Sequence, residues 1–103
     1  MRNDQKSLAD IYSRIITESN GRKVIKGDVD LDDLYLEELP DWLSDVEVRG
    51  GFYCSNNKLT TLAGAPETVG GTFSCSDNPG NFTEEDVRAV SDVDGEIYNY
   101  GAI

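Results

Sequence analysis

The sequence VRGGFYCSNN at residues 48–57 recurs 21 residues later as VGGTFSCSDN at residues 69–78. Six of the ten aligned positions are identical. They pair Val48 with Val69, Gly50 with Gly71, Phe52 with Phe73, Cys54 with Cys75, Ser55 with Ser76, and Asn57 with Asn78. So many identities at one fixed offset predict that the chain contains a repeated structural unit of this length.

Within each copy, apolar side chains lie two residues apart, at Phe52 and Cys54 and again at Phe73 and Cys75. Alternate residues of a β-strand face the same side of the sheet. The spacing therefore predicts two strands that bury these pairs and turn the intervening residues outward.

The segment FYCSNNKLTTL at residues 52–62 has the form L-x-L-x-x-N-x-L-x-x-L, which is typical of the strand and turn of a leucine-rich repeat. In this form the amide of Asn57 is expected to bond backbone groups of neighbouring coils where the chain turns out of the strand. We therefore expect an α/β fold, a short leucine-rich-repeat-like solenoid with about four parallel strands.

Two further segments fit the same unit. DVDLDDLYLEELP at residues 28–40 fills every core position of the unit and departs only at the Asn position, where Leu34 stands. VDGEIYN at residues 93–99 repeats the entry into a strand. The expected inward rows are Val29, Phe52, Phe73, Ile97 and Leu31, Cys54, Cys75, Asn99. We predict one domain, residues 1–103, with its repeat stack at 28–99.

Helices are expected before and within this stack. Residues 4–19 carry Leu8, Ile11, Tyr12, Ile15 and Ile16 at helical spacing, which predicts an amphipathic helix in an N-terminal cap at 1–21. A partner-binding role is the alternative for this helix. Residues 41–46 predict one short helical turn that packs Trp42 and Leu43 inward. Residues 83–90, which open with a capping-box pattern, predict a short helix before the last strand.

The chain is strongly acidic, with 20 Asp and Glu against 9 Lys and Arg, no His and a net charge of -11. Direct nucleic-acid binding is not expected, because phosphate contacts need Lys and Arg. The acid-rich run at 28–47 is a candidate surface for a basic protein, or simply a solubilising surface. Its candidate residues are Asp28, Asp33, Glu37, Glu38, Asp41, Asp45 and Glu47.

Metal binding and catalysis find little support. Asp28, Asp30 and Asp32 match the opening of a calcium-binding EF-hand loop, but Asp33 replaces the required Gly and Leu39 replaces the closing Glu. A chain without His has no His-based triad and no imidazole metal site. We therefore expect no catalytic, metal-binding or cofactor-binding residues, and no cofactor.

Two cysteines and no export signal indicate a reducing cytoplasm and free thiols. Cys54 and Cys75 occupy equivalent positions of neighbouring coils and are expected to pack as buried thiols, with a disulfide as the alternative. The apolar runs are too short to cross a membrane.

Outward positions of the four strands are expected to form one continuous face that binds a protein partner, because it carries two tyrosines among carboxylates and hydroxyls. A solvated face without a partner is the alternative. The candidate residues are Asp30, Asp32, Tyr53, Ser55, Ser74, Ser76, Glu96 and Tyr98. The strand edge at 97–99 offers a place for a second copy, so a homodimer is also considered.

The pattern LPxWL…VxGxFYCSNNKLTTLxGAPxxVGGxFxCSxN at residues 39–78, with FTEEDVRAV and DGEIYN closing the chain at 82–99, resembles the small leucine-rich-repeat-like proteins of tailed bacteriophages. The resemblance covers most of the chain after Gly27. It implies a repeat fold, a phage or prophage origin and, from the class of small acidic phage proteins, binding to host machinery.

The function expected from these observations is a non-enzymatic protein–protein interaction module in the cytoplasm of a bacterial host. It would be a phage-encoded inhibitor or modulator of a host defence or nucleic-acid-processing protein. One alternative is an acidic nucleic-acid mimic that blocks the basic groove of a nuclease, restriction enzyme, CRISPR effector or polymerase. Another is a virion-associated structural protein.

Overall fold

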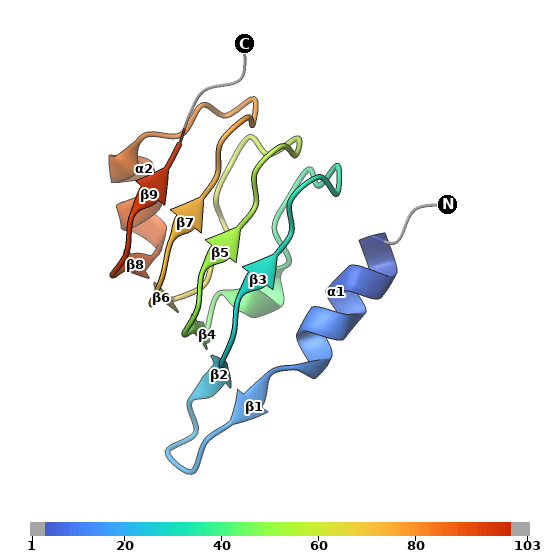
Figure 1. Ribbon diagram of the computed structural model, residues 1–103, viewed down its shortest axis with the longest axis vertical. Coiled ribbons are helices and arrows are strands. Elements are labelled where there is room, and N and C mark those ends of the chain that lie inside the picture. The colour runs from blue at the N-terminus through green and yellow to red at the C-terminus, as the bar shows by residue number, and fades with distance from the viewer. Residues whose placement is uncertain (1–3, 100–103) are drawn as a thin grey trace.

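The computed structural model describes residues 4–99, which form an α/β fold of short strands and few helices (Figure 1). The elements are α1 (Asp4–Ser13), β1 (Ile16–Thr17), β2 (Lys23–Ile25), β3 (Val29–Asp30), the 3-10 helix η1 (Asp41–Leu43), β4 (Val46–Val48), β5 (Phe52–Tyr53), β6 (Thr68–Val69), β7 (Phe73–Ser74), α2 (Glu84–Val90), β8 (Asp92–Val93) and β9 (Ile97–Tyr98).

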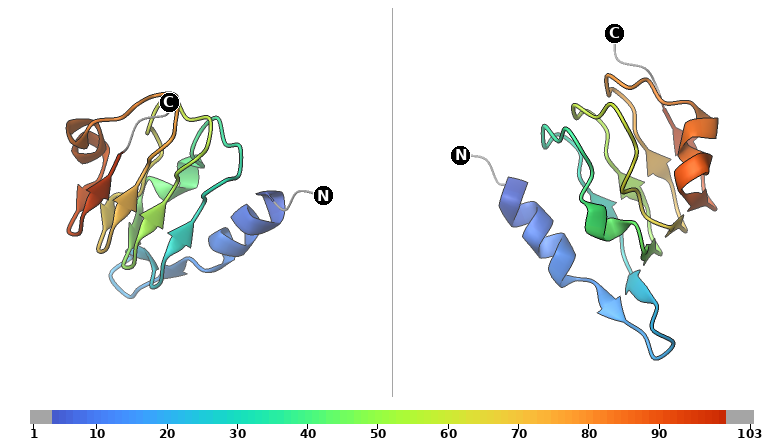
Figure 2. Two further views of the ribbon diagram at one scale, coloured as in Figure 1. Left: turned by 45° about the horizontal axis from the view of Figure 1, so that its top comes forward. Right: turned by 180° about the vertical axis from the view of Figure 1, so that it is seen from behind.

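The strands form two sheets, in the orders β1-β2-β4-β6-β8 and β3-β5-β7-β9. From β2 onward successive strands belong to the two sheets in turn, so each sheet gains a strand whenever the chain passes round (Figures 1 and 2). Every pair is parallel except β1 with β2. Parallel neighbours cannot be joined by a tight hairpin, and the long connections through the other sheet meet that requirement.

The register of the second sheet agrees with the sequence-based prediction. Val29 lies opposite Phe52, Phe52 opposite Phe73, and Phe73 opposite Ile97. Only the β3-β5-β7-β9 sheet was expected, however. The first sheet was missed, because β4, β6 and β8 lie just before the glycine corners, in residues that the prediction assigned to the connections between strands.

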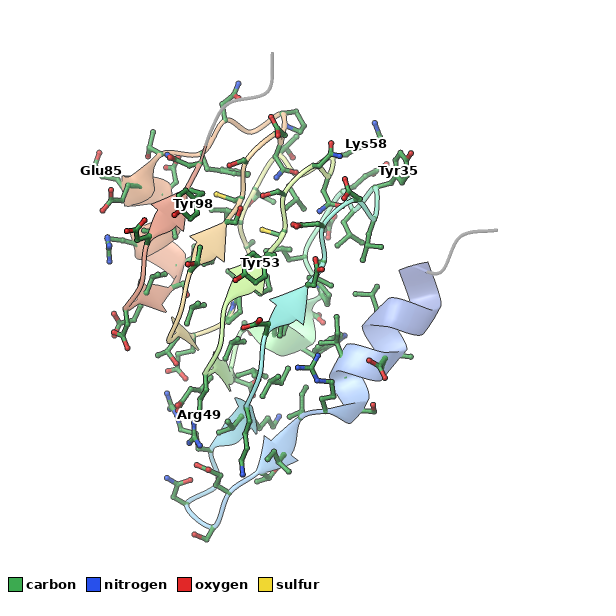
Figure 3. The ribbon with its side chains drawn as sticks, in the orientation of Figure 1. Tyr35, Arg49, Tyr53, Lys58, Glu85 and Tyr98 are labelled. Atoms are coloured by element: carbon green, nitrogen blue, oxygen red, sulfur yellow. The ribbon has the colours of Figure 1, made fainter. Side chains whose placement is uncertain are left out.

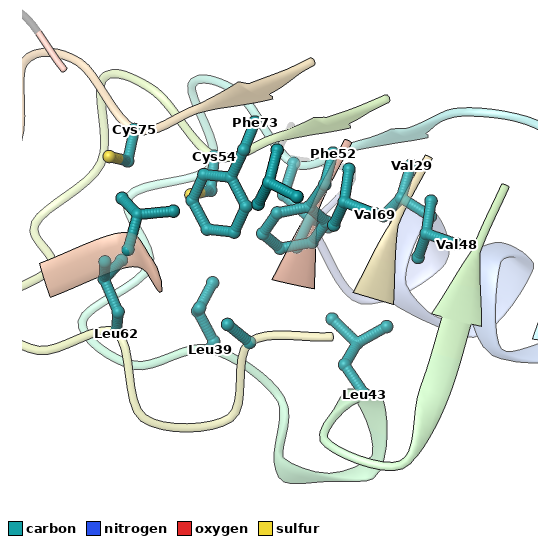
Figure 4. Packing of buried hydrophobic residues seen from close by; sticks show 14 of the residues in the cluster. Val29, Leu39, Leu43, Val48, Phe52, Cys54, Leu62, Val69, Phe73 and Cys75 are labelled. Carbon is teal, nitrogen blue, oxygen red and sulfur yellow. The ribbon is translucent and has the colours of Figure 1, made fainter. Parts of the chain in front are cut away.

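The core lies between the two sheets. The Phe52 and Phe73 rings pack with their centroids 5.2 Å apart, and valines and leucines of both sheets and of the connections surround them (Figure 4). Cys54 and Cys75 are buried beside these rings as free thiols. Burial raises the pKa of the Cys54 thiol well above its ordinary value and raises the pKa of Cys75 to about 11.

Buried asparagines join neighbouring turns of the chain, as the sequence predicted. Asn57 accepts hydrogen bonds from the Leu34 and Leu36 amides, both at 3.0 Å, and its Nδ2 donates to the Leu31 carbonyl at 2.9 Å. Asn78 repeats the donation one turn later, from its Nδ2 to the Cys54 carbonyl. These bonds satisfy backbone groups that no strand partner reaches at the turn.

The N-terminal helix is shorter than predicted. It ends at Ser13, and Ile16–Thr17 forms a strand that pairs antiparallel with β2, with Ile16 opposite Val24. The β-branched residues on both sides of a turn that contains Gly21, at φ 85°, favour a hairpin over a continued helix. Among residues 8–13 of α1, whose burial the structure describes, only Ile11 is fully buried in the core cluster. Ile16, expected on the apolar helix face, is 43% exposed.

The other two predicted helical segments are present in the structure. The turn expected at 41–46 is the shorter η1, which buries Leu43 and leaves Trp42 half-buried. Helix α2 has the predicted capping box, in which Thr83 and Asp86 exchange side-chain-to-backbone hydrogen bonds. None of the helices within residues 4–99 is long and apolar enough to cross a lipid bilayer.

Candidate functional site: the open face of the second sheet

The outer face of the β3-β5-β7-β9 sheet is open. Neither α1 nor α2 crosses it in Figures 1 and 3, and the Tyr53 and Tyr98 side chains lie on it. Strand register places Asp30, Tyr53, Ser74 and Tyr98 in one row. We call this surface the tyrosine face, composed of Asp30, Asp32, Tyr53, Ser55, Ser74, Glu96 and Tyr98. The structure thus brings together seven of the eight residues that the sequence assigned to one face.

Ser76 is the exception, because it is only 8% exposed. It lies where the chain turns out of β7, and its backbone amide donates to the Ser55 hydroxyl at 3.1 Å. The Ser55 hydroxyl is also 2.6 Å from the Ser74 hydroxyl, and the Ser55 amide donates to Asp32 at 2.7 Å. These hydroxyls and this carboxylate therefore hold neighbouring strands together, which limits what they can offer a ligand.

The two tyrosine side chains lean in the same direction along their strands. A Cβ added to Gly51 would lie 2.5 Å from the Tyr53 hydroxyl, so the Tyr53 ring lies over Gly51, two residues earlier in the chain. The Tyr98 hydroxyl donates to Glu96, also two residues earlier, at 2.9 Å. Both rings therefore point towards the N-terminal end of their strands.

The carboxylates at the β3 side of this face are close together, and the pKa of one of them, Asp32, is raised. Asp30 accepts from the backbone amide of Asp32 at 3.0 Å. Partial burial raises the pKa of Asp32, and the charges of Asp30 and Asp33 raise it further, whereas the hydrogen bond from Ser55 opposes the shift. The face therefore carries carboxylates at both edges, Asp30 and Asp32 by β3 and Glu96 by β9, with the tyrosines on β5 and β9.

The predicted acidic surface is divided between the two sheets. Asp28 accepts from the Gly51 amide at 2.7 Å, and Asp33 accepts from the Asn56 side chain. Asp45 pairs with Lys23 at 3.1 Å. Glu37, Glu38 and Asp41 are exposed.

Glu47 lies on β4, in the other sheet. It pairs with Arg22 at 3.0 Å and Arg49 at 2.9 Å. Hydrogen bonds from Arg49 and then Arg22 lower the pKa of Glu47. The basic residues of the β1-β2 hairpin and the β4 end thus neutralise one end of the acidic run.

The three carboxylates that match the opening of an EF-hand loop make hydrogen bonds to the backbone instead. Asp28, Asp30 and Asp32 each accept a backbone amide hydrogen bond. Within residues 4–99, no group of three or more Cys, Asp or Glu side chains is placed to hold a metal ion.

Sequence reasoning missed a second surface, a groove of about 550 Å3 between α1 and η1. Tyr12 was assigned to the buried side of the helix, but it is 57% exposed, and its ring meets the Trp42 ring at a centroid distance of 5.0 Å. The only sequence signal was two aromatic residues on elements expected to pack near the same end of the stack.

Comparisons with known proteins do not place the chain in a family. No protein-family model matches it, and searches of curated proteins and of solved structures found no significant match.

Proposed function

We propose that this chain is a non-enzymatic protein-binding module, folded as a short leucine-rich-repeat-like solenoid, that engages its partner through the tyrosine face. The aligned strands of the open sheet are 23, 21 and 24 residues apart in the chain, and buried asparagines link successive turns. Both features support the repeat architecture. Solenoid proteins commonly bind partners on a continuous sheet surface of this kind.

The observation that carries the proposal is the presence of two tyrosine rings on an uncovered sheet face (Figure 3). Tyr98 is 40% exposed and anchored through its hydroxyl to Glu96. Tyr53 is half-buried over Gly51. Tyrosine is enriched at interface hot spots, because its ring supplies contact area while its hydroxyl keeps a polar partner.

The partner we propose is a bacterial host protein, with the chain acting as a phage-encoded inhibitor or modulator of defence or nucleic-acid processing. This choice of partner rests on the resemblance of the sequence to small leucine-rich-repeat-like proteins of tailed bacteriophages. A nucleic-acid mimic has less support, because Arg22, Lys23 and Arg49 pair with carboxylates of the acidic run. Mimicry of a phosphate backbone needs a row of unpaired negative charges.

The experiment captures proteins from a bacterial host lysate on the tagged chain, at low and at high salt. The variants are Tyr53→Ala and Tyr98→Ala, and the matched control is Tyr35→Ala, which removes a tyrosine 61% exposed on a loop away from the face (Figure 3). A partner bound through the tyrosine face should be retained at high salt. Each face variant should weaken it by about ten-fold or more, as expected for hot-spot residues.

The control variant should bind as the parent does. If Asp→Asn changes abolished capture while the tyrosine variants left it intact, the result would refute the proposal in favour of electrostatic mimicry. Equal losses in all three tyrosine variants would also refute it, because they would indicate a general effect on the fold.

A further inference from the structure

The groove between α1 and η1 lies apart from the tyrosine face, at the N-terminal side of the stack. Figure 2 (right) shows α1 running beside the short helical turn at 41–43. The groove is lined by Tyr12, Ile15, Thr17, Lys23, Asp41, Trp42, Ser44 and Asp45. A shallower apolar hollow, lined by Leu8, Ala9, Tyr12 and Trp42, adjoins it. The two share the same aromatic pair.

The aromatic pair forms a corner. The Tyr12 and Trp42 rings are 5.0 Å apart with an interplanar angle of 79°. In this edge-to-face pair the edge of one ring meets the face of the other, and both residues line the groove. The negative face of an aromatic ring attracts a cation, so the ring surface that borders the groove favours a positively charged occupant. Trp is the strongest of the aromatic side chains in this interaction.

Carboxylates border the same groove. Asp41 and Asp45 both line it, and both are exposed. An occupant that stacks on the rings and carries positive charge would therefore find counter-charges beside it. The net charge of -11 draws a basic segment towards the chain as a whole.

A cation of the chain itself already occupies part of the groove. Lys23, from β2, lines it and places its Nζ 3.1 Å from Asp45 Oδ2. This pair is exposed, with 49% and 62% of the two side chains accessible, so it is weak and easily displaced. The position of the Lys23 ammonium marks where a cationic group is favoured.

We infer that this groove binds an arginine side chain presented by a basic segment of a partner protein. The guanidinium stacks on the Tyr12–Trp42 corner and takes over the Asp45 carboxylate from Lys23. Arginine fits better than lysine, because its planar fork bonds a carboxylate through two parallel hydrogen bonds and stacks on rings. The apolar hollow beside the corner receives an apolar side chain next to that arginine.

The test uses the intact chain and a capped peptide with alternating leucine and arginine. Trp42 is the only tryptophan in the sequence, so its fluorescence and its indole N–H signal in an NMR titration report on the groove directly. The control peptide replaces each arginine with citrulline, which keeps the shape and removes the charge. The arginine peptide should shift the Trp42 signals to saturation, and the citrulline peptide should leave them near their starting positions.

Two charge-changing variants should shift the affinity in opposite directions, and a distant control variant separates this effect from general charge attraction. Asp45→Asn should weaken binding by about five-fold, the factor expected for one charge pair in water. Lys23→Gln should tighten binding by a similar factor of about five, because it removes the competing cation. Lys58→Gln, which makes the same change in net charge on a distant loop, is the matched control and should bind as the parent does.

Tyr12→Leu keeps the apolar contact and the Trp42 reporter and should weaken binding, because it removes one wall of the corner. Three results would overturn the inference. These are equal responses to the two peptides, shifts spread over the acidic surface without the Trp42 indole, and equal tightening by Lys23→Gln and Lys58→Gln. None involves the tyrosine face, so failure here is separate from failure of the proposed function.

Discussion

Replacing Asn57 with Ala should be among the most damaging single substitutions in this chain. The Asn57 side chain bonds five backbone groups. It accepts from two amides, of Leu34 and Leu36, and donates to three carbonyls, of Leu31, Cys54 and Ser55. The bonds to the Leu31 and Cys54 carbonyls are buried, whereas the others are partly accessible to water. Alanine replaces none of them.

The magnitude follows from this division. A buried polar group left without a partner costs about 1–3 kcal/mol, and a partly accessible one costs less because water replaces the lost bond. The Leu31 carbonyl loses a buried bond and the Leu34 and Leu36 amides lose partly accessible ones, whereas the Cys54 carbonyl keeps its bond from Asn78. The sum for Asn57→Ala is therefore about 3 kcal/mol. A domain of this size is stable by roughly 5–15 kcal/mol, so this single change removes a large share of the total.

Urea unfolding followed by circular dichroism measures the effect. With a slope of about 2 kcal/mol per molar urea, the midpoint should fall by about 1.5 M. Asn20→Ala is the control, because Asn20 makes one exposed hydrogen bond, from the Arg22 amide, and should cost under about 1 kcal/mol. If Asn57→Ala cost no more than Asn20→Ala, the argument that this amide holds neighbouring turns together would be wrong.

Three further predictions concern stability and reactivity. Gly95→Ala should cost about 2 kcal/mol in urea unfolding, because its Cβ would lie 2.4 Å from the Gly71 carbonyl oxygen, whereas Gly27→Ala would meet only a side chain and should be nearly neutral. Asp32 binds its proton more tightly folded than unfolded, so its ionisation lowers stability as the pH rises from the ordinary value of 3.8 through its raised pKa. The uncharged variant Asp32→Asn should therefore be more stable than the parent at pH 7 and lose that advantage near pH 3; equal pH profiles would contradict this. The buried Cys54 and Cys75 thiols, with raised pKa values, should react with iodoacetamide at pH 8 only as fast as the fold opens, and rapid native-state labelling would contradict their burial.

The parts of the fold that the sequence predicted are those encoded by repetition or by a local signal. Phe52 and Phe73 occupy identical settings in two copies, so their alignment followed from the fixed offset. The cap of α2 depends only on Thr83 and its near neighbours, and it too was predicted correctly. The Asn57 contacts were expected in kind from the repeat form, although the individual bonds were not.

The misses have a common physical cause, which is that tertiary pairing outweighed local periodicity. Ile16 fits a helical pattern, but pairing with Val24 across the turn places it in a strand. That early end of α1 sets Tyr12 against Trp42, a contact between residues 30 positions apart that no local pattern encodes. The sheet members of the tyrosine face were predictable from alternation alone, whereas the burial of Ser76 depends on how the chain turns.

The strand register has a consequence for how the chain folds. No pair in the two parallel sheets joins residues more than 24 positions apart, as in the pairing of Phe73 with Ile97. Each successive loop closure therefore carries nearly the same entropic cost, and none awaits a contact between distant ends of the chain. Amides of β9 can then exchange with solvent through opening of the last turn alone, whereas those of β5, held on both sides, wait for a larger opening.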